Sequence, residues 1–312
     1  MSKILVIGGT GNIGQHLVTA SLNAGHPTAV LVRLTTVASD TSKAKLVNSL
    51  QARGACIVYG DMNDHASLVA AMKQHGEVVI SAVGHGRPEE LDGQLKIMEA
   101  IKEAGCVKRF VPSEFGSDAE HAELTLEPAK SMMESKLRVR QVMRAAGIPH
   151  TIICSNWAIG LLLSGLGDSP ENGPLSTGLN IFGDEKTRAI FLDEKDMSML
   201  AIKTVEDPRT LNKVLYMRPP TNVCSFGKLV HLLEKKTGRA LERQYVSELE
   251  LAKKIHEAPF PLNFQLAMVH STLVHSGALM DTFDASLGVE ATQLYPEVKF
   301  VTVEEYLNGL LL

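Results

Sequence analysis

The chain has 312 residues, of which 45% are hydrophobic and 21% are charged. This is the composition of a globular protein, and it excludes a disordered, collagen-like or coiled-coil chain. Lys and Arg together number 31 against 35 Asp and Glu, a formal net charge of −4, so the chain offers no basic field to polyanions. We therefore expect neither nucleic acid nor a membrane as a partner.

The cysteines and the apolar runs bear on the cellular compartment. The cysteines are widely spaced and form no Cys-x-x-Cys pair, which favours neither a zinc site nor a disulfide framework: Cys56, Cys106, Cys154 and Cys224. The apolar run at residues 4–7 is too short for a signal peptide, and residues 157–167 are too few to cross a bilayer. We expect a cytoplasmic protein with reduced thiols and no bound metal.

In the first half of the chain, short β-branched runs alternate with longer helical patterns. The runs that predict strands are 4–7, 28–32, 56–59, 78–81, 109–111 and 151–154. The helical patterns lie near 12–24, 41–53, 65–74, 94–104 and 131–146, each followed by a glycine where a C-terminal cap belongs. Such alternation predicts right-handed βαβ units, because parallel strands need long crossovers. We predict an α/β fold, a doubly wound parallel sheet over residues 1–155.

After residue 155 the pattern changes. Gly and Pro become frequent over residues 165–183, which is typical of an ordered lid, a binding loop or a linker. Helical patterns then recur at 194–205, 225–237, 247–258, 266–276 and 303–311. We predict a smaller, mainly helical substrate lobe over residues 156–312, in which some strands could return to the main sheet. Its Met and Leu pattern leaves room for a homodimer without requiring one.

A glycine-rich loop directly follows the first predicted strand and opens the first helix. Its residues are Gly8, Gly9, Thr10, Gly11, Asn12, Ile13 and Gly14. Small residues at this spacing permit a tight turn and let backbone N–H groups and the positive end of the helix approach a pyrophosphate. In this strand-turn-helix context the loop indicates a dinucleotide site rather than a tight turn alone.

Arg33 directly follows the second predicted strand, at the place where NAD-dependent proteins usually have an acidic residue for the ribose 2′-hydroxyl. A guanidinium pairs instead with a 2′-phosphate, which predicts NADP(H) rather than NAD(H). Lys43 and Lys45 could add further bonds, although a solvated helix face explains either lysine equally well.

A lysine on the fifth helical pattern is the candidate base. Short-chain reductases of this fold usually carry Tyr-x-x-x-Lys, and here Met132 replaces the tyrosine four residues before Lys136. Arg140 follows one turn later on the same face. Lys136 could act as a base if burial and a neighbouring cation lowered its pKa. An ordinary exposed lysine on a cationic helix is the alternative that spacing alone leaves open.

Several segments resemble one plant protein family. They are residues 8–14, the Val-Pro-Ser-Glu-Phe-Gly run at 111–116, residues 127–131 leading to Lys136, residues 207–213 and residues 288–299. The chain resembles pinoresinol-lariciresinol, isoflavone and phenylcoumaran benzylic ether reductases, an atypical short-chain dehydrogenase group with NmrA-like relatives. Residues 81–86, 127–131 and 261–263 are most similar to the phenylcoumaran benzylic ether reductase and isoflavone-reductase-like branch.

This resemblance implies roles for individual residues. Lys136 would be the catalytic base and NADPH the cofactor. The expected cofactor contacts are Thr10, Gly11, Asn12, Ile13, Arg33, Lys43, Val83, Phe115, Arg140 and Asn156.

The chain departs from the family where a substrate wall is expected. The family commonly reads Asn-Cys-Phe-Ala-Gly-Tyr-Phe after the sixth strand, and residues 156–162 here read Asn-Trp-Ala-Ile-Gly-Leu-Leu. We expect substrate contacts from residues near the carboxyl end of that strand, and from one on the lysine helix: Trp157, Ile159, Leu161 and Met132. Packing in a core is the alternative for these apolar side chains.

The leading hypothesis is an NADPH-dependent reductase of a small plant phenolic of the phenylpropanoid type. Lys136 would remove a phenolic proton, the benzylic ether would open to a quinone methide, and hydride would add to the benzylic carbon. Reduction of pinoresinol, lariciresinol or another substrate of the family is the first alternative. The second is a non-catalytic NmrA-like NADP(H) sensor, which needs no titratable group at the nicotinamide, so Lys136 distinguishes the two classes.

Overall fold

The computed structural model describes residues 1–84, 88–160, 178–182, 184–274, 286 and 288–310. The chain divides into two compact units. Unit 1 consists of Met1–Phe115, Ser135–Ile153 and Met197–Leu215, and unit 2 of Gly116–Glu134, Cys154–Asp196 and Tyr216–Leu312. The two units therefore interleave along the chain, whereas the sequence predicts one boundary after residue 155.

Unit 1 is built on a parallel sheet. Its strands are β1 (Ile4–Ile7), β2 (Thr28–Val32), β3 (Cys56–Tyr59), β4 (Val78–Ser81) and β5 (Arg109–Val111), in the order β3-β2-β1-β4-β5. A parallel bridge between Phe110 and His150 leads to β6 (Thr151–Cys154), which pairs with β10 (Lys213–Tyr216). The strand order reverses between β1 and β4, and the predicted doubly wound α/β fold is confirmed.

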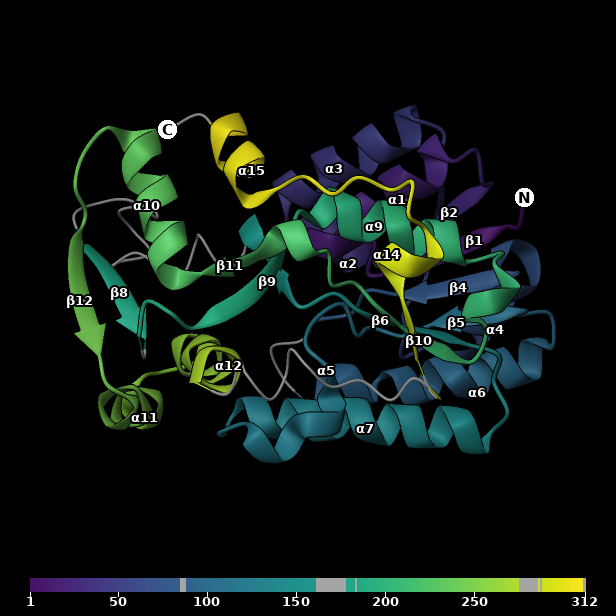
Figure 1. The fold of residues 1–312 in the computed structure, drawn as a ribbon. Helices are drawn as coiled ribbons and strands as arrows, with labels where there is room; N and C mark the ends of the chain where they lie inside the picture. Colours follow the sequence, from purple (N-terminus) through teal and green to yellow (C-terminus); the bar gives the residue numbers. More distant parts are fainter. Residues whose placement is uncertain (85–87, 161–177, 183, 275–285, 287, 311–312) are drawn as a thin grey trace. The chain divides into compact units, whose positions relative to one another are not determined.

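Helices cover the sheet of unit 1. They are α1 (Asn12–Asn23), α2 (Leu34–Ser39), α3 (Thr41–Ala52), α4 (His65–His75), α5 (Pro88–Asp92), α6 (Gln94–Ala104), α7 (Ala129–Ala145) and α9 (Glu194–Thr204), with the short 3-10 turn η2 (Pro208–Thr210). In Figure 1, α1, α3 and α9 lie on one face of the sheet, and α6 and α7 lie on the other. Because both faces are covered, β1, β2, β4 and β5 are buried along their whole length. The short helices α2 and α5 have no counterpart in the sequence prediction.

A buried arginine ties the last segment of unit 1 to its sheet. The guanidinium of Arg109, on β5, donates to Thr204 O, to Thr210 Oγ1 at 2.8 Å and to Asp207 O at 3.0 Å. A buried cation needs such partners. Residues 197–215 therefore complete this unit, although they follow the predicted boundary by more than forty positions.

Unit 2 combines helices with short strands. The strands are β7 (Trp157–Ala158), β8 (Gly178–Phe182), β9 (Arg188–Leu192), β11 (Val223–Ser225), β12 (Glu242–Val246) and β13 (Gly288–Glu290). In one sheet β9 lies between β7 and β11, and in another β8 pairs with β12 in parallel. The helices are α10 (Phe226–Thr237), α11 (Glu248–Glu257), α12 (Leu262–Val274), α14 (Ala291–Leu294) and α15 (Val303–Gly309), with η1 (Ala119–Leu124) and η3 (Pro220–Asn222). The unit thus contains more strand than the predicted mainly helical lobe.

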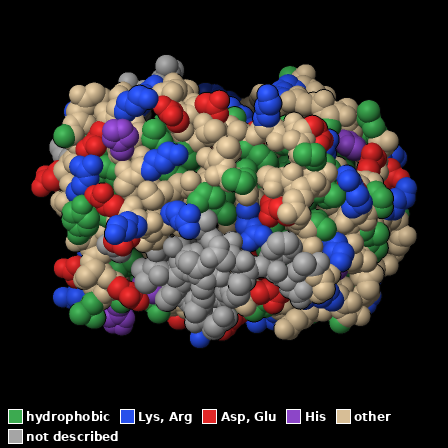
Figure 2. Space-filling view, in the orientation of Figure 1, with side chains coloured by type: hydrophobic (Ala, Val, Ile, Leu, Met, Phe, Trp, Pro, Cys, Tyr) green, Lys and Arg blue, Asp and Glu red, His purple; other side chains and the backbone are tan. Residues whose placement is uncertain are grey.

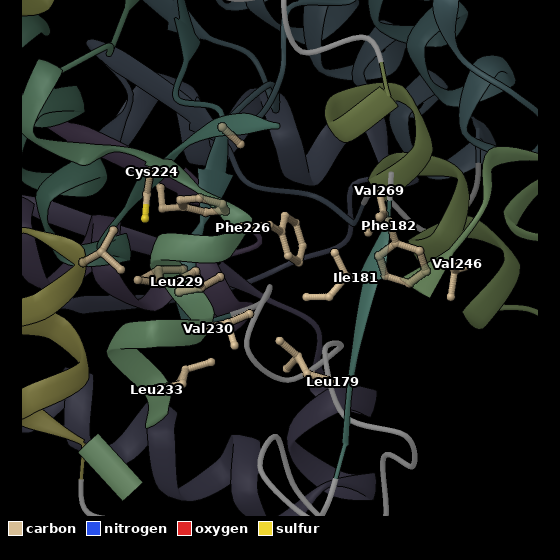
Figure 3. Packing of buried hydrophobic residues seen from close by; sticks show 14 of the residues in the cluster. Leu179, Ile181, Phe182, Cys224, Phe226, Leu229, Val230, Leu233, Val246 and Val269 are labelled. Carbon is tan, nitrogen blue, oxygen red and sulfur yellow. The ribbon is translucent and has the colours of Figure 1, made fainter. Parts of the chain in front are cut away.

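A hydrophobic cluster lies among the described residues of unit 2. Figure 3 shows Phe226 and Val230 of α10 facing Leu179 and Ile181 of β8. Ile159 belongs to the same cluster and is 1% exposed. The amphipathic face of α10 therefore finds its partner in a strand that the Gly- and Pro-rich composition conceals.

Acidic and basic side chains are interspersed over the face shown in Figure 2. Among the described helices, none is long and apolar enough to cross a membrane.

Candidate active site

The glycine loop joins β1 to α1 by a turn that side chains would block. Gly8 has φ of +84°, and a Cβ atom there would lie 2.3 Å from the carbonyl oxygen of Ala82, the residue after β4. At Gly14 a Cβ atom would lie 2.1 Å from Gly8 O. Gly11 N donates to Gly8 O at 3.0 Å and closes the turn. Glycine at these positions lets the helix begin directly against the strand ends.

The first turn of α1 has backbone donors available. Gly11 is its N-cap, no side chain caps the helix, and the first turn contains no acidic residue. The first N–H groups of a helix have no intrahelical acceptor, so they can bind an anion. By contrast, Asp40 caps α3 by accepting from the backbone N–H groups of Ser42 and Lys43 at 2.9 and 3.0 Å. The loop fits the pyrophosphate of a dinucleotide.

Arg33 lies at the end of β2, as the sequence predicts, and is exposed at the N-cap of α2. Within the described part of the chain its guanidinium forms no hydrogen bond or ion pair. Lys43 is half-buried in the first turn of α3, and Lys45 is exposed. An unengaged guanidinium at this position fits a ribose 2′-phosphate, and the predicted contact stays a prediction.

Hydrogen bonds link the carboxyl ends of β4 and β5 to α6. Ser113 Oγ donates to Val83 O at 3.0 Å, and Ser113 N donates to Gln94 Oε1 at 2.7 Å. Ser113 and Gln94 are both buried. These loops lie beside the point where the strand order reverses, which is where ligands bind in open α/β sheets.

Three charged side chains are buried after β5. Lys136 on α7 is 3% exposed, and its Nζ donates to the main-chain oxygen of Glu114 at 2.8 Å. Arg140, one turn later, is 1% exposed and makes a two-point pair with the Glu114 carboxylate, Nε to Oε1 at 2.8 Å and Nη2 to Oε2 at 3.0 Å. Phe115 follows with φ of +24°, a value uncommon outside glycine.

This geometry decides one question that spacing leaves open. The cationic surface of α7 is carried by residues such as Arg138 and Arg144, which are exposed, and Lys136 is not one of them. Burying an amine costs free energy unless it gains partners. The alternative of an ordinary exposed lysine is wrong, and Lys136 meets the first structural requirement of a general base.

The other predicted site residues belong to unit 2. Met132 is buried, and Asn156, with φ of +55°, donates from Nδ2 to Met217 O at 3.1 Å. Trp157 is half-buried and packs against the hydrophobic cluster, which also contains Ile159. For Ile159 this position favours the core alternative. Leu161 lies outside the described residues.

Three buried residues of the site have no role that the sequence alone predicts. The motif at residues 111–116 is recognisable, but it indicates no role for Glu114 or Ser113, and no sequence signal points to Gln94. Their partners lie 19 to 30 positions away, so only the fold reveals the contacts.

In the part of the chain that the structure covers, no group of three His, Cys, Asp or Glu side chains could hold a metal ion.

The chain is similar to known proteins over almost its whole length. A family model described as the NmrA-like family matches residues 1–307. Phenylcoumaran benzylic ether reductase Pyrc5 of Pyrus communis is 49% identical over 98% of this chain and 98% of its own. Eugenol synthase 2 of Clarkia breweri is also 49% identical, over 98% of each chain.

Solved structures agree. A crystal structure of isoflavone reductase superimposes with a TM-score of 0.89 at 38% identity and covers 100% of both chains. The binary complex of leucoanthocyanidin reductase with NADPH from Vitis vinifera has a TM-score of 0.88 at 36% identity and covers 98% of both. The fold and the resemblance that the motifs indicate are confirmed.

Proposed function

Because the chain belongs to the NmrA-like family, we propose that it is an NADPH-dependent reductase of phenylpropanoid-type phenolics. The named reductases at 49% identity and the NADPH complex of a structural relative support this proposal. The observation that carries it is the buried Lys136 amine, bonded to Glu114 O just after β5 of the same sheet whose first strand leads into the glycine loop.

Different residues of unit 1 would bind different parts of NADPH. The N–H groups at the start of α1 would hold the pyrophosphate, and Arg33, with Lys43, would hold the 2′-phosphate. Val83 and Phe115, at the ends of β4 and β5, would flank the nicotinamide end. Bound NADPH supplies the hydride.

Lys136 would act on the phenol of the substrate. A neutral amine accepts the phenolic proton, and the resulting electron density opens the bond between the benzylic carbon and its leaving oxygen. That carbon then becomes the hydride acceptor, and the departing oxygen takes a proton. General-base catalysis of this kind is typically worth ~10²- to 10⁴-fold in rate.

The buried amine also separates this proposal from the sensor alternative. A protein that only senses NADP(H) needs no titratable group at the nicotinamide, and a buried lysine lowers stability unless its partners compensate. The buried position of Lys136 therefore favours a catalytic role over a sensor.

The substrate is proposed at the level of a class. A benzylic ether reductase and a eugenol synthase are equally similar to this chain, so we propose a phenylpropanoid phenolic with a leaving oxygen at or conjugated to the benzylic position. Isoflavones and pinoresinol- or lariciresinol-type lignans are the alternatives within the family. A contact of Trp157 with the substrate remains a prediction.

The test is steady-state NADPH consumption by the full chain with a phenylcoumaran, an isoflavone and a pinoresinol-type lignan, followed by product chromatography. We expect turnover of at least one phenolic and a loss of at least ~10²-fold in kcat for Lys136→Met, with NADPH affinity retained. Lys130→Met, on the same helix, is the matched control and should keep wild-type turnover. Tight NADPH binding without consumption of any phenolic would favour the sensor.

We also propose a cytoplasmic location, which the four free cysteines support. A homodimer remains a prediction.

A further inference from the structure

We infer that Arg140 is a positioning residue that engages the Glu114 carboxylate and so keeps this negative charge from stabilising the ammonium form of Lys136. The inference rests on the proposed function, since it assigns Arg140 a part in preparing the base. It replaces the direct cofactor contact that the family resemblance implies for Arg140.

Glu114 meets α7 at two places. Its main-chain oxygen accepts from Lys136 Nζ at 2.8 Å, while its two carboxylate oxygens accept from Arg140. The two partners are four residues apart, so they lie on the same face of the helix. One acidic residue thus receives both cations, the amine through a neutral carbonyl and the guanidinium through the charged carboxylate.

The backbone geometry keeps the Glu114 carbonyl and carboxylate on different partners. Glu114 N donates to Pro112 O at 2.9 Å, which turns the chain tightly after β5. Phe115 then adopts φ of +24°. Residues held in such conformations cluster at functional sites, where the surroundings maintain the strain. Here the strained turn directs the Glu114 carbonyl towards α7.

A lysine that acts as a base requires the carboxylate charge to be paired with another cation. A carboxylate close to a lysine stabilises the ammonium form and raises its pKa, whereas a carbonyl is a weaker, uncharged partner. An ammonium group cannot act as a base. The guanidinium of Arg140 is always charged and its planar fork matches a carboxylate, so it balances Glu114 at every working pH.

Other charged groups lie on or near α7. Arg138 pairs with Asp92 of α5 through Nη2 at 3.0 and 3.1 Å, and Glu134 and Arg144 are exposed. His150, at the start of β6, has its pKa lowered, first by burial and then by Arg144 and Arg140, so it stays neutral near pH 7. The Lys136 amine is thus bonded to the main-chain oxygen of Glu114, while the carboxylate of the same residue is bonded to Arg140.

The decisive measurement is an NMR titration of Lys136 in chains carrying isotope-labelled lysine, with Lys136→Met to assign the signal. For Arg140→Met we expect the titration midpoint to rise by about one unit or more, the effect of a nearby opposite charge. In Glu114→Gln/Arg140→Met, which has neither charge, the midpoint should return close to that of the wild type. This readout needs no substrate, so it is independent of the proposed function.

The kinetic measurement follows the acidic limb of the plot of kcat against pH. For Arg140→Met we expect this limb to shift to higher pH by as much as the titration midpoint of Lys136, which lowers kcat about tenfold at pH values on the limb. The limb should return in the double variant. The matched control is Glu234→Gln/Arg243→Met in unit 2, which removes another two-point pair, at 2.9 and 3.1 Å, and should leave the limb unchanged.

Because Arg140→Met leaves a buried carboxylate unpaired, that variant could fail to fold. Arg140→Lys, which keeps the charge, and the double variant then carry the test, and both should titrate like the wild type. An unshifted midpoint in folded Arg140→Met, or a double variant whose midpoint moves by a unit or whose kcat is lost at every pH, would overturn the inference. A shift as expected without turnover of any phenolic would instead overturn only the proposed function.

Discussion

A single exposed guanidinium carries the choice between the two nicotinamide cofactors. Arg33 has no partner in the described part of the chain, so a 2′-phosphate would meet it without having to displace another group. For Arg33→Gln we expect NADPH affinity to fall by roughly ten- to a hundredfold, the ~1.5–3 kcal/mol of a hydrogen bond to a charged group, while NADH affinity stays nearly constant. Calorimetric Kd values for both cofactors measure the change.

The control for this variant is Arg188→Gln, which alters the net charge equally at an exposed position of unit 2. It should leave both affinities unchanged. If Arg33→Gln weakens NADPH and NADH equally, Arg33 does not read the phosphate.

The glycine loop offers a steric test of the same cofactor site. A Cβ atom at Gly14 would meet Gly8 O at 2.1 Å and Gly9 Cα at 2.8 Å, and both are backbone atoms that cannot move aside. We expect Gly14→Ala to lower the free energy of unfolding by about 1–3 kcal/mol, as overpacking does, and to abolish most NADPH binding. Thermal melts and cofactor titrations measure the two effects.

Gly309, near the end of α15, is the matched control because nothing lies within 4 Å of a Cβ atom built there. Gly309→Ala should be neutral or slightly stabilising. Equal effects of the two substitutions would mean that the loop tolerates a side chain.

Lys136 and its neighbours show what a linear sequence conveys about a site and what it omits. The sequence supports a catalytic lysine through its motif and an arginine one turn later. It cannot show that both side chains are buried, because burial depends on the turn at residues 112–115, about twenty positions away. The sequence also cannot show that Ile159, which we expected at the substrate, packs in the core instead.

Among the elements, those formed by local patterns were predictable and those formed by distant pairing were not. The strands from β1 to β6 are apolar β-branched runs, and their bounds match the prediction. In contrast β12 reads Glu-Arg-Gln-Tyr-Val and is largely exposed, so its strand conformation depends on pairing with β8. The helix α2, only six residues long, follows Arg33 without a capping side chain and gives no sequence signal.

The entry into β6 should respond to pH. His150 is buried, its Nδ1 lies 2.8 Å from Ile148 O, and burial lowers its pKa from 6.5. Because the native state binds fewer protons than the unfolded state, this contribution to stability is present above pH 6.5 and is lost as the pH falls towards the native pKa. We expect the wild-type chain to lose up to about 1.4 kcal/mol per pH unit within that window.

His150→Asn keeps a donor for Ile148 O without an ionisable ring, so its melting temperature should depend less on pH below 6.5. Thermal melts of both proteins between neutral and mildly acidic pH measure the difference. Parallel curves would show that His150 does not titrate on unfolding.

For the whole molecule, the interleaving of the two units sets the smallest stable piece. A fragment of residues 1–155 lacks Met197–Leu215, and with it every acceptor of the Arg109 guanidinium named above. Removing partners from a buried charge costs up to about 3–5 kcal/mol, a large share of the ~5–15 kcal/mol that stabilises a domain. We expect the fragment to show no cooperative melt by circular dichroism, whereas the full chain melts cooperatively.

Substituting Arg109→Met in the fragment separates the missing charge partners from the missing apolar contacts, and it should recover part of the lost structure. A fragment of residues 1–155 that melts like the full chain would instead support a domain boundary there.

The return of the chain to its first sheet also has a consequence during synthesis. Strand β6 emerges from the ribosome well before β10, its neighbour in the sheet. Roughly 60 residues separate Ile153 from Leu215, and at about 5–20 residues per second they take several seconds to translate. Throughout that interval the growing chain carries an unpaired strand edge, the kind of surface on which nascent proteins aggregate, so we expect the newborn protein to benefit from chaperones until β10 is made.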